Sequence, residues 1–405
     1  MKRSLPAVLS VLLLMPLASV AQPLSRVDST AQRLADAGFA NVRAVETPEF
    51  VAFTVENDYY KIPAEGFARA VQIIEGAGLA DGSKPVKLIG TNFKVPEVTI
   101  AYDPQAGIWR TTKRLDAAWD AVRGEPRLND SFGKVDLVVH PALSLTNLII
   151  DRVYQTLWEL KPTLSVSLWP GSRLSYQLII PVYTDFFETS YKKVHPGFIT
   201  LSQRFRDPWH LNILGKVTIG NFSSRRYGAV LEAGYWFPNE RFSMDTMMGV
   251  VMPAMFYGFR WRYSLEPRFV FSLAGNFYSP ALQTQFTLRA QRFLEGDYGL
   301  KYEMIRHFRR CSVGLYVERG VEIWNGIVYD TPHTNAGFRF QVALPPYRMK
   351  RHGYIPKVST SAQMGMNYNA NNEQRFYKEF TTESIDNIMS RNYFNPYYIN
   401  GMLGR

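Results

Sequence analysis

Residues 283–308 constrain the fold of this chain more than any other stretch of its sequence. Polar and apolar side chains alternate over 283–291, and the alternation repeats over 297–307. A two-residue period is typical of β-strands, and Gly296 between the two halves can adopt the positive φ that a tight connection requires. The stretch therefore predicts a β-hairpin with one apolar face and one charged face.

Similar alternating segments recur from Lys134 onward, separated by turn residues. Examples are RLSYQLIIPVYT, RYGAVLEAGYWF, EPRFVFSLAGNFY and NAGFRFQVAL. We count roughly 12 to 14 of them, each about the 9–11 residues that a tilted strand needs to cross a membrane. Alternation alone also fits a soluble sandwich with one solvated face per sheet.

Two further features favour a transmembrane antiparallel β-barrel over residues 132–368. Full charges lie within the polar faces of the strands, as a hydrated interior permits. Aromatic residues cluster near strand ends, where a bilayer interface would hold them. The clusters are Tyr183, Phe186 and Phe187; Tyr235, Trp236 and Phe237; and Phe277 and Tyr278.

The first 21 residues, MKRSLPAVLSVLLLMPLASVA, have the features of a secretory signal peptide. Two basic residues precede an apolar stretch, and the small residues at 19–21 predict cleavage after Ala21. A retained membrane anchor is the alternative, but the apolar stretch is short and Pro16 interrupts it. We therefore expect the mature protein in the outer membrane of a Gram-negative cell.

Charge and cysteine content limit the possible partners. The formal net charge falls from +11 to +9 after cleavage, because residues 1–21 carry two basic and no acidic side chains. A basic, exported protein suits anionic lipid head groups or an acidic polymer and not nucleic acid. Cys311 is the single cysteine, so no intramolecular disulfide can form.

Residues 24–125 lack the alternating pattern and predict a small α+β module located in the periplasm. A helix over 25–37 ends at a glycine, and a second helix begins at Pro63, with apolar residues at helical spacing. Strands are expected over 40–44, 50–56, 85–89 and 97–102, and a short helix within 113–122. We interpret the module as a docking domain, with a simple spacer as the alternative.

The C-terminal tail, residues 369–405, departs from the strand pattern. Its sequence predicts a partly helical segment up to Asn392 and irregular chain beyond. Three placements are open: the periplasm, the barrel interior as a plug, and the surface of the small module.

Two stretches resemble a known family. They are VENDYYKIPAEGFARAVQII at 55–74 and FLEGDYGLKYEMIRHFRRCSVGLYVERG at 293–320. Both are similar to segments of the YjbH family, outer-membrane β-barrel proteins encoded with exopolysaccharide and capsule genes, to which the GfcD-type proteins also belong. Typical members are nearly twice as long and hold two barrel halves, whereas this chain resembles the C-terminal half alone.

The resemblance implies a role in secreting an extracellular or capsular polysaccharide through the outer membrane. It also implies a second barrel or a periplasmic export component as a possible partner. It supplies no catalytic residue.

Charged side chains on the predicted inner faces are our candidates for a hydrated track that contacts the polymer. Arginine binds carboxylates in a bidentate manner, which suits an acidic polysaccharide. The alternative is that the charges pair with one another across strands, such as Lys301 or Arg289 with Asp297 or Glu303. A narrow barrel can also be filled by its own side chains. The candidates are Arg173, Arg204, Lys216, Arg268, Arg289, Asp297, Lys301, Glu303 and Arg339.

Two other functions stay open: a general porin for small solutes and an outer-membrane lipid hydrolase. A simple porin needs no docking module. A hydrolase needs serine and histidine on adjacent strands, and the six histidines are scattered along the chain. The sequence shows no zinc-ligand pattern and no phosphate-binding loop. We therefore expect no cofactor, no metal site and no enzymatic activity.

Overall fold

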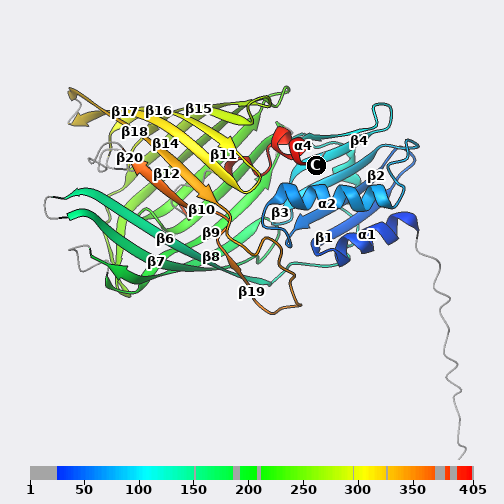
Figure 1. The fold of residues 1–405 in the computed structure, drawn as a ribbon, viewed down its shortest axis with the longest axis horizontal. Helices are drawn as coiled ribbons and strands as arrows, with labels where there is room; N and C mark the ends of the chain where they lie inside the picture. The colour runs from blue at the N-terminus through cyan, green and yellow to red at the C-terminus, as the bar shows by residue number, and fades with distance from the viewer. Residues whose placement is uncertain are drawn as a thin grey trace, which may run out of the picture.

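The computed structural model describes residues 25–149, 152–185, 192–207, 211–294, 296–324, 327–369, 379–383 and 390–403. A five-stranded sheet and a 15-stranded sheet make up most of it (Figure 1). The prediction of a mainly β chain is confirmed. The predicted signal peptide lies outside the described residues.

The N-terminal module contains the elements in the expected order, with one additional strand. They are α1 (Arg26–Asp36), β1 (Phe39–Glu46), β2 (Val51–Asn57), α2 (Pro63–Gly76), β3 (Val86–Asn92), β4 (Val95–Asp103), β5 (Ile108–Thr112) and α3 (Ala117–Val122). The strands lie side by side in chain order. Only β2 and β3 are parallel, so α2 forms the crossover between them.

Local sequence explains the starts of α1 and α2 and the packing of α2. The side chain of Ser25 caps α1 by accepting a hydrogen bond from the amide of Asp28 at 3.0 Å, and Pro63 occupies the first turn of α2. Phe67 of α2 is fully buried. A Cβ atom on Gly90 of β3 would lie 2.5 Å from the Phe67 ring, so only glycine allows this close packing.

The large sheet is formed by the strands that follow the module. They are β6 (Val135–Ile149), β7 (Arg152–Val166), β8 (Ser172–Thr184), β9 (His195–Arg206), β10 (Ile213–Phe222), β11 (Arg226–Trp236), β12 (Phe242–Tyr257), β13 (Arg260–Tyr263), β14 (Arg268–Ser279), β15 (Thr284–Arg292), β16 (Tyr298–His307), β17 (Cys311–Trp324), β18 (Ile327–Val342), β19 (Lys357–Thr360) and β20 (Met364–Asn369). From β6 to β18, neighbours in the chain are antiparallel neighbours in the sheet, and β13 pairs only with β12.

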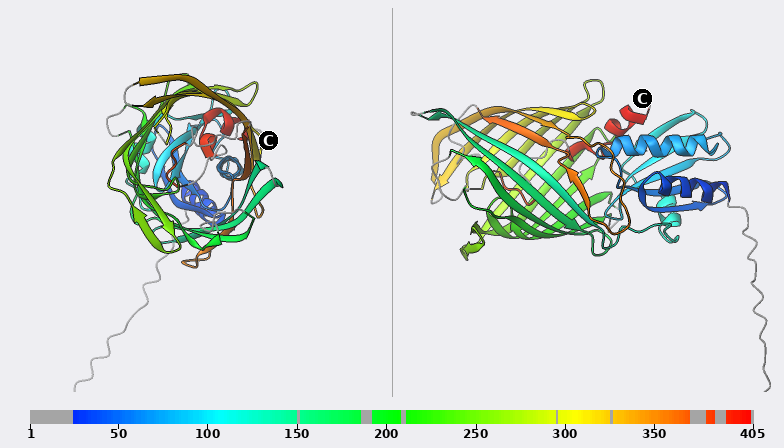
Figure 2. Two further views of the ribbon diagram at one scale, coloured as in Figure 1. Left: turned by 90° about the vertical axis from the view of Figure 1, so that its left-hand side faces the viewer. Right: turned by 60° about the horizontal axis from the view of Figure 1, so that its bottom comes forward.

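The large sheet curls round on itself, as Figure 2 shows. Its hydrogen-bonded path begins at β19 and ends at β20, and no ladder joins β20 to β6 among the described residues. β20 nevertheless lies beside β6. At the same seam, β19 pairs with β6 in the parallel direction, which departs from the expected all-antiparallel arrangement. The hydrogen-bonded sheet is therefore open at the seam between β20 and β6.

The two faces of the curled sheet differ as the alternation predicts. On β15 and β16, Thr287, Lys301 and Glu303 are buried on the inner face, each about 2 % exposed. Leu288 and Leu300 on the outer face are 56 % and 55 % exposed. No helix among the described residues is both long and apolar enough to span a membrane.

The predicted aromatic clusters are only partly on the outer face. Tyr183, Tyr235 and Phe237 are exposed, whereas Phe186 and Phe187 lie outside the described residues. Two assignments were wrong. Tyr278 is buried and stacks on Tyr397 of the tail, with 6.1 Å between ring centroids. Trp236 faces inward and lies under Lys113.

The tail contains a short 3₁₀ helix, Ser390–Asn392, and α4 (Pro396–Leu403). The prediction of irregular chain after Asn392 was therefore wrong, because α4 begins four residues later. Ile399 and Met402 of α4 are buried in the hydrophobic core of the module, beside α2. The predicted helix before Asn392 falls mostly outside the described residues.

Candidate functional site

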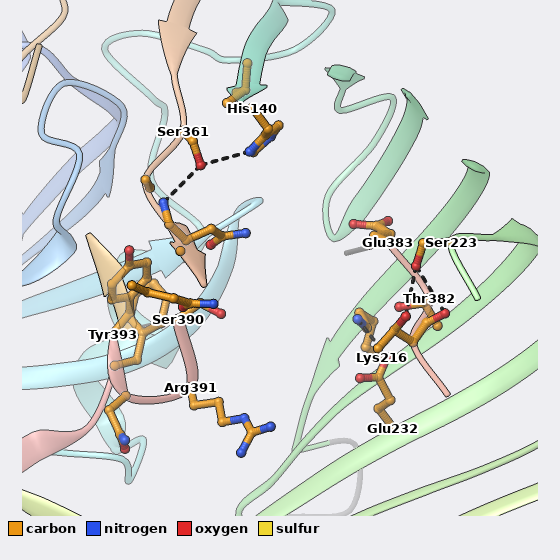
Figure 3. A pocket seen from close by; sticks show the side chains of 18 of the residues that line it. His140, Lys216, Ser223, Glu232, Ser361, Thr382, Glu383, Ser390, Arg391 and Tyr393 are labelled. Atoms are coloured by element: carbon orange, nitrogen blue, oxygen red, sulfur yellow. Dashed lines mark hydrogen bonds and ion pairs between the residues drawn. The ribbon is translucent and has the colours of Figure 1, made fainter. Parts of the chain in front are cut away.

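A cavity of about 1880 Å³ occupies the interior of the curled sheet. We call it the central cavity. The inner faces of the large sheet line most of it, β2 and β4 of the module close one end, and the tail enters it. Figure 3 shows His140 and Ser361 on one side and Lys216, Ser223 and Glu383 on the other.

The structure separates the nine predicted site residues into two groups. Five of them line the central cavity: Arg173, Arg204, Lys216, Arg289 and Arg339. The other four do not. Lys301 and Glu303 are buried beneath the tail, Asp297 is buried just before β16, and Arg268 is half-buried at the start of β14. These four therefore do not face the central cavity as predicted, and the polymer track itself stays a prediction.

Some of the cavity cations pair with acids on the sheet. Lys216 Nζ lies 2.7 Å from Glu232 Oε2 on the neighbouring strand, and Arg289 Nη2 lies 3.0 Å from Asp245 Oδ1. Arg289 and Lys301 stand opposite each other in the β15–β16 register. Two like charges in that position repel each other, so each needs its own carboxylate. Lys301 finds Glu318 of β17 at 3.9 Å.

The tail supplies further carboxylates to the inner face. We call residues 379–383 the tail segment. Glu379 accepts hydrogen bonds from Lys301 Nζ at 2.5 Å and from Gln291 Nε2 at 3.3 Å. Glu383 accepts from Thr200 Oγ1 at 2.9 Å and from Arg173 Nη1 at 3.3 Å. Lys301 therefore pairs with Glu318 of the sheet and Glu379 of the tail, and not with Asp297 or Glu303 as predicted.

Apolar packing and backbone hydrogen bonds also hold the tail segment. Phe380 contacts Phe222 edge-to-face, with 5.3 Å between ring centroids, inside a small apolar cluster on the inner face. The Ser223 amide donates to the Thr382 carbonyl at 2.9 Å, and Ser224 Oγ donates to the Thr381 carbonyl at 2.9 Å. Of the three predicted placements for the tail, this segment adopts the interior one and α4 adopts the module one.

Glu303 connects the sheet to the part of the tail that follows. It pairs with Arg339 of β18 at 2.8 Å and with Arg391 of the tail. Because Glu303 is almost fully buried, both partners compensate for its removal from water. Glu303 therefore anchors the tail and does not face the cavity.

A second set of ion pairs fastens the module to the sheet, and all of its module residues come from the sequence DYYKIPAEG at 58–66. Asp58 pairs with Arg351 at 2.6 Å and with Lys357 at 2.5 Å. Glu65 pairs with Arg309 at 2.8 Å and with Arg310 at 3.1 Å. We call these contacts the clasp.

Burial shapes the protonation of the clasp. It raises the pKa of Asp58, but the hydrogen bonds and charges of Arg351 and Lys357 outweigh it and bring the pKa below its ordinary value. Burial lowers the pKa of Lys61 to about 8. Lys61 Nζ donates to the Leu344 carbonyl at 2.5 Å and to Thr360 Oγ1 at 2.7 Å. No local sequence pattern indicates the clasp, because its partners lie more than 200 residues away.

Arg204, a predicted polymer contact, also joins the module to the sheet. Its guanidinium lies 3.2 Å from Glu97 Oε1 of β4, and Lys113 Nζ lies 3.5 Å from Glu97 Oε2. Lys113 also lies over the Trp236 ring, 4.4 Å from its centroid. Burial lowers the pKa of Lys113 to about 8, although the neighbouring Glu97 acts in the opposite direction.

The fold brings two histidines next to serines, which the sequence spacing did not predict. His140 Nδ1 lies 3.0 Å from Ser361 Oγ beside the cavity, and His307 Nδ1 lies 2.8 Å from Ser312 Oγ. The other nitrogen of His307 contacts Asn392 at 2.6 Å. In the described part of the chain, no carboxylate hydrogen-bonds either ring, and no group of three or more metal-ligating side chains occurs.

Comparisons with protein-family models, with curated proteins and with solved structures found no match for this chain. The resemblance of residues 55–74 and 293–320 to the YjbH family therefore stays a prediction from the sequence.

Proposed function

We propose that the protein is an outer-membrane β-barrel that assists the secretion of an extracellular or capsular polysaccharide and catalyses no reaction. The observation that carries this proposal is the division between the two faces of the large sheet. The outer face is apolar along successive strands, and the inner face is ionic around a central cavity.

The outer face would be poorly suited to water. Soluble proteins rarely expose a contiguous apolar surface larger than a few hundred Å², whereas the lipid-facing band of a membrane barrel is apolar all round. Exposed apolar side chains occur on nearly every long strand of the sheet. They include Leu160, Leu174, Ile199, Val217, Ile219, Met248, Val250, Phe269, Leu273, Leu288, Leu300, Val313, Leu315, Val317, Phe338 and Phe340.

The proposal includes closure of the sheet in the membrane. Backbone groups in hydrocarbon must be paired within the protein, since lipid offers no hydrogen bonds. β20 and β6 already lie side by side at the seam. Pairing of β20 with the part of β6 beyond Val139, which β19 leaves uncovered, would close the barrel.

Three features support a polymer as the cargo. The central cavity carries arginine side chains from β8, β15 and β18, and guanidinium groups bind carboxylates well. The clasp fixes the module at one end of the sheet, where it would meet periplasmic partners. The sequence resemblance to exopolysaccharide proteins points in the same direction. The tail segment in the interior disfavours a permanently open small-solute porin.

Reconstitution into a planar lipid bilayer, paired with a secretion assay in cells that lack the protein, tests the proposal. We expect membrane insertion, loss of surface polysaccharide without the protein, and channel events that added acidic polysaccharide blocks. Steady small-solute conductance that the polysaccharide leaves unchanged would favour the porin. A protein that stays in the aqueous fraction would refute the membrane assignment.

A further inference from the structure

We infer that the tail segment is a built-in competitor for the exported polymer, and that the polymer is an acidic polysaccharide recognised through its carboxylates. In this view, Glu379 and Glu383 occupy the cation sites to which the carboxylates of such a polymer bind. The inference rests on the proposed function, since it assumes that a polymer reaches the central cavity.

Each tail carboxylate lies in a group of cations. Lys301, Arg339 and Arg391 act on Glu379, and Arg173, Arg204 and Lys216 act on Glu383. Charge-assisted hydrogen bonds to carboxylates are among the stronger polar contacts in proteins. The structure thus contains two sites that already bind a carboxylate, and chain from the same molecule fills both.

The site at Glu383 has donor capacity to spare. Arg173 makes one hydrogen bond to Glu383, at 3.3 Å from Nη1, while its buried Nε atom has no partner among the described residues. Buried donors are almost always satisfied in folded proteins. A carboxylate that approached the Nε–Nη2 edge of the guanidinium could form a bidentate pair there, which Glu383, bound at Nη1, does not form.

The arrangement of the tail segment suits reversible binding. Its polar contacts are separate side-chain hydrogen bonds to the wall, including that from Ser224 Oγ, together with one backbone–backbone bond at Ser223. One apolar side chain, Phe380, holds it to the inner face. Both carboxylates keep some exposure to the cavity, 21 % for Glu379 and 17 % for Glu383. An incoming polyanion can therefore approach Arg173 and Lys216 from the cavity, whereas Lys301 becomes accessible when Glu379 leaves.

The test is binding of polygalacturonate oligomers to the full-length protein in detergent micelles, measured by isothermal titration calorimetry. The double variant Glu379→Gln/Glu383→Gln keeps the shape of the tail segment but frees the cations. It should bind the oligomer at least about tenfold more tightly than the wild type, because loss of even one of the two charged competitor contacts corresponds to roughly that change. Phe380→Ala, which loosens the segment without changing charge, should shift affinity in the same direction.

Two controls separate recognition from damage to the fold. Arg173→Gln should weaken binding of the oligomer, opposite in sign to the tail variants, whereas general unfolding would weaken binding in every variant. Glu49→Gln, at an exposed position of the module, should bind as the wild type does. Neutral dextran of equal length should bind no more tightly to the tail variants.

The inference and the proposed function fail in different ways. Equal oligomer affinity in the wild type and the tail variants would overturn the inference, even if the protein inserts into membranes and supports secretion. Dextran binding that rises together with oligomer binding would overturn the carboxylate specificity. Absence of membrane insertion would overturn the proposed function without any binding measurement.

Discussion

Leu288 and Arg289 are neighbours on β15, yet they meet opposite surroundings. Leu288 is 56 % exposed on the outer face, and Arg289 pairs with Asp245 on the inner face at 3.0 Å. Leu288→Arg should place a charge in hydrocarbon at a cost of roughly 2–4 kcal/mol and reduce the assembled fraction. Arg289→Ala should assemble normally. The measurement is heat-modifiable migration of the protein from outer-membrane fractions, and equal assembly of both variants would contradict the assigned faces.

Asp58 makes the clasp sensitive to acid. Its pKa in the folded protein lies below the ordinary value of 3.8, because Arg351 and Lys357 outweigh the effect of burial. A carboxyl with a lowered folded pKa stabilises the protein above its unfolded pKa, and this stability is lost as the pH falls through the folded pKa. The melting temperature of the wild type in micelles should therefore fall progressively below about pH 4.

Asp58→Asn should remove that part of the acid dependence of stability. It should also lower the free energy of unfolding at pH 7 by roughly 3 kcal/mol, because two buried cations lose a partner. Asp136 stays within 2.6 Å of Arg351, which limits the loss. Asp120→Asn is the matched control, since the Asp120–Arg123 pair is exposed on the module surface and contributes little. An unchanged acid profile in Asp58→Asn would mean that the clasp does not control stability.

At the scale of elements, the sequence predicted those strands whose side chains alternate regularly. The β15–β16 hairpin was found because a two-residue period assigns every second side chain to one face. β5 was missed, since its five residues bury only Thr111 and carry no apolar alternation. α4 was missed because its apolar residues pack on the module and not on a neighbouring part of the tail.

The two elements that the sequence did not predict, β5 and α4, contact each other. Asn400 of α4 accepts a hydrogen bond from the Thr111 amide of β5 at 2.9 Å, across 289 positions of sequence. The site residues follow the same pattern. Their facing was predictable from the local period, but their partners Glu97, Glu379 and Arg391 come from distant segments that no local pattern identifies. The sequence therefore predicted the inner face and could not predict what fills it.

The packing of α4 on the module can be tested at Ile399, which is fully buried in the module core. Ile399→Ala should lower the free energy of unfolding by roughly 2–5 kcal/mol, the usual cost of such a buried truncation, and Ile399→Val by only about 0.5–1.5 kcal/mol. Urea unfolding in micelles, followed by near-UV circular dichroism, measures both. If Ile399→Ala lowered the free energy of unfolding by less than Ile399→Val, α4 would not pack on the module in solution.

At the scale of the whole molecule, the C-terminal helix α4 packs on the N-terminal module. The tail segment lines the central cavity, and α4 packs against α2 of the module (Figure 1). The clasp and the Glu97 cluster fix the module to the same end of the sheet. The interior is thus bounded by module and tail together. Under the proposed function, passage of a polymer would require the tail segment to leave the cation sites.

The seam between β20 and β6 decides whether the curled sheet becomes a barrel. β19 covers β6 only over Asp136–Val139, and alternate amides of β6 beyond Val139 point toward β20 and not toward β7. Hydrogen exchange in lipid nanodiscs measures how well these amides are protected by hydrogen bonds. If the sheet closes in a membrane, they and the outer amides of β20 should exchange as slowly as those of β15, which pairs on both sides. The short strand β13, which pairs only with β12, supplies the fast reference. Exchange at the seam as fast as in β13 would mean that the edges stay free, and a sheet with free edges could not lie in hydrocarbon.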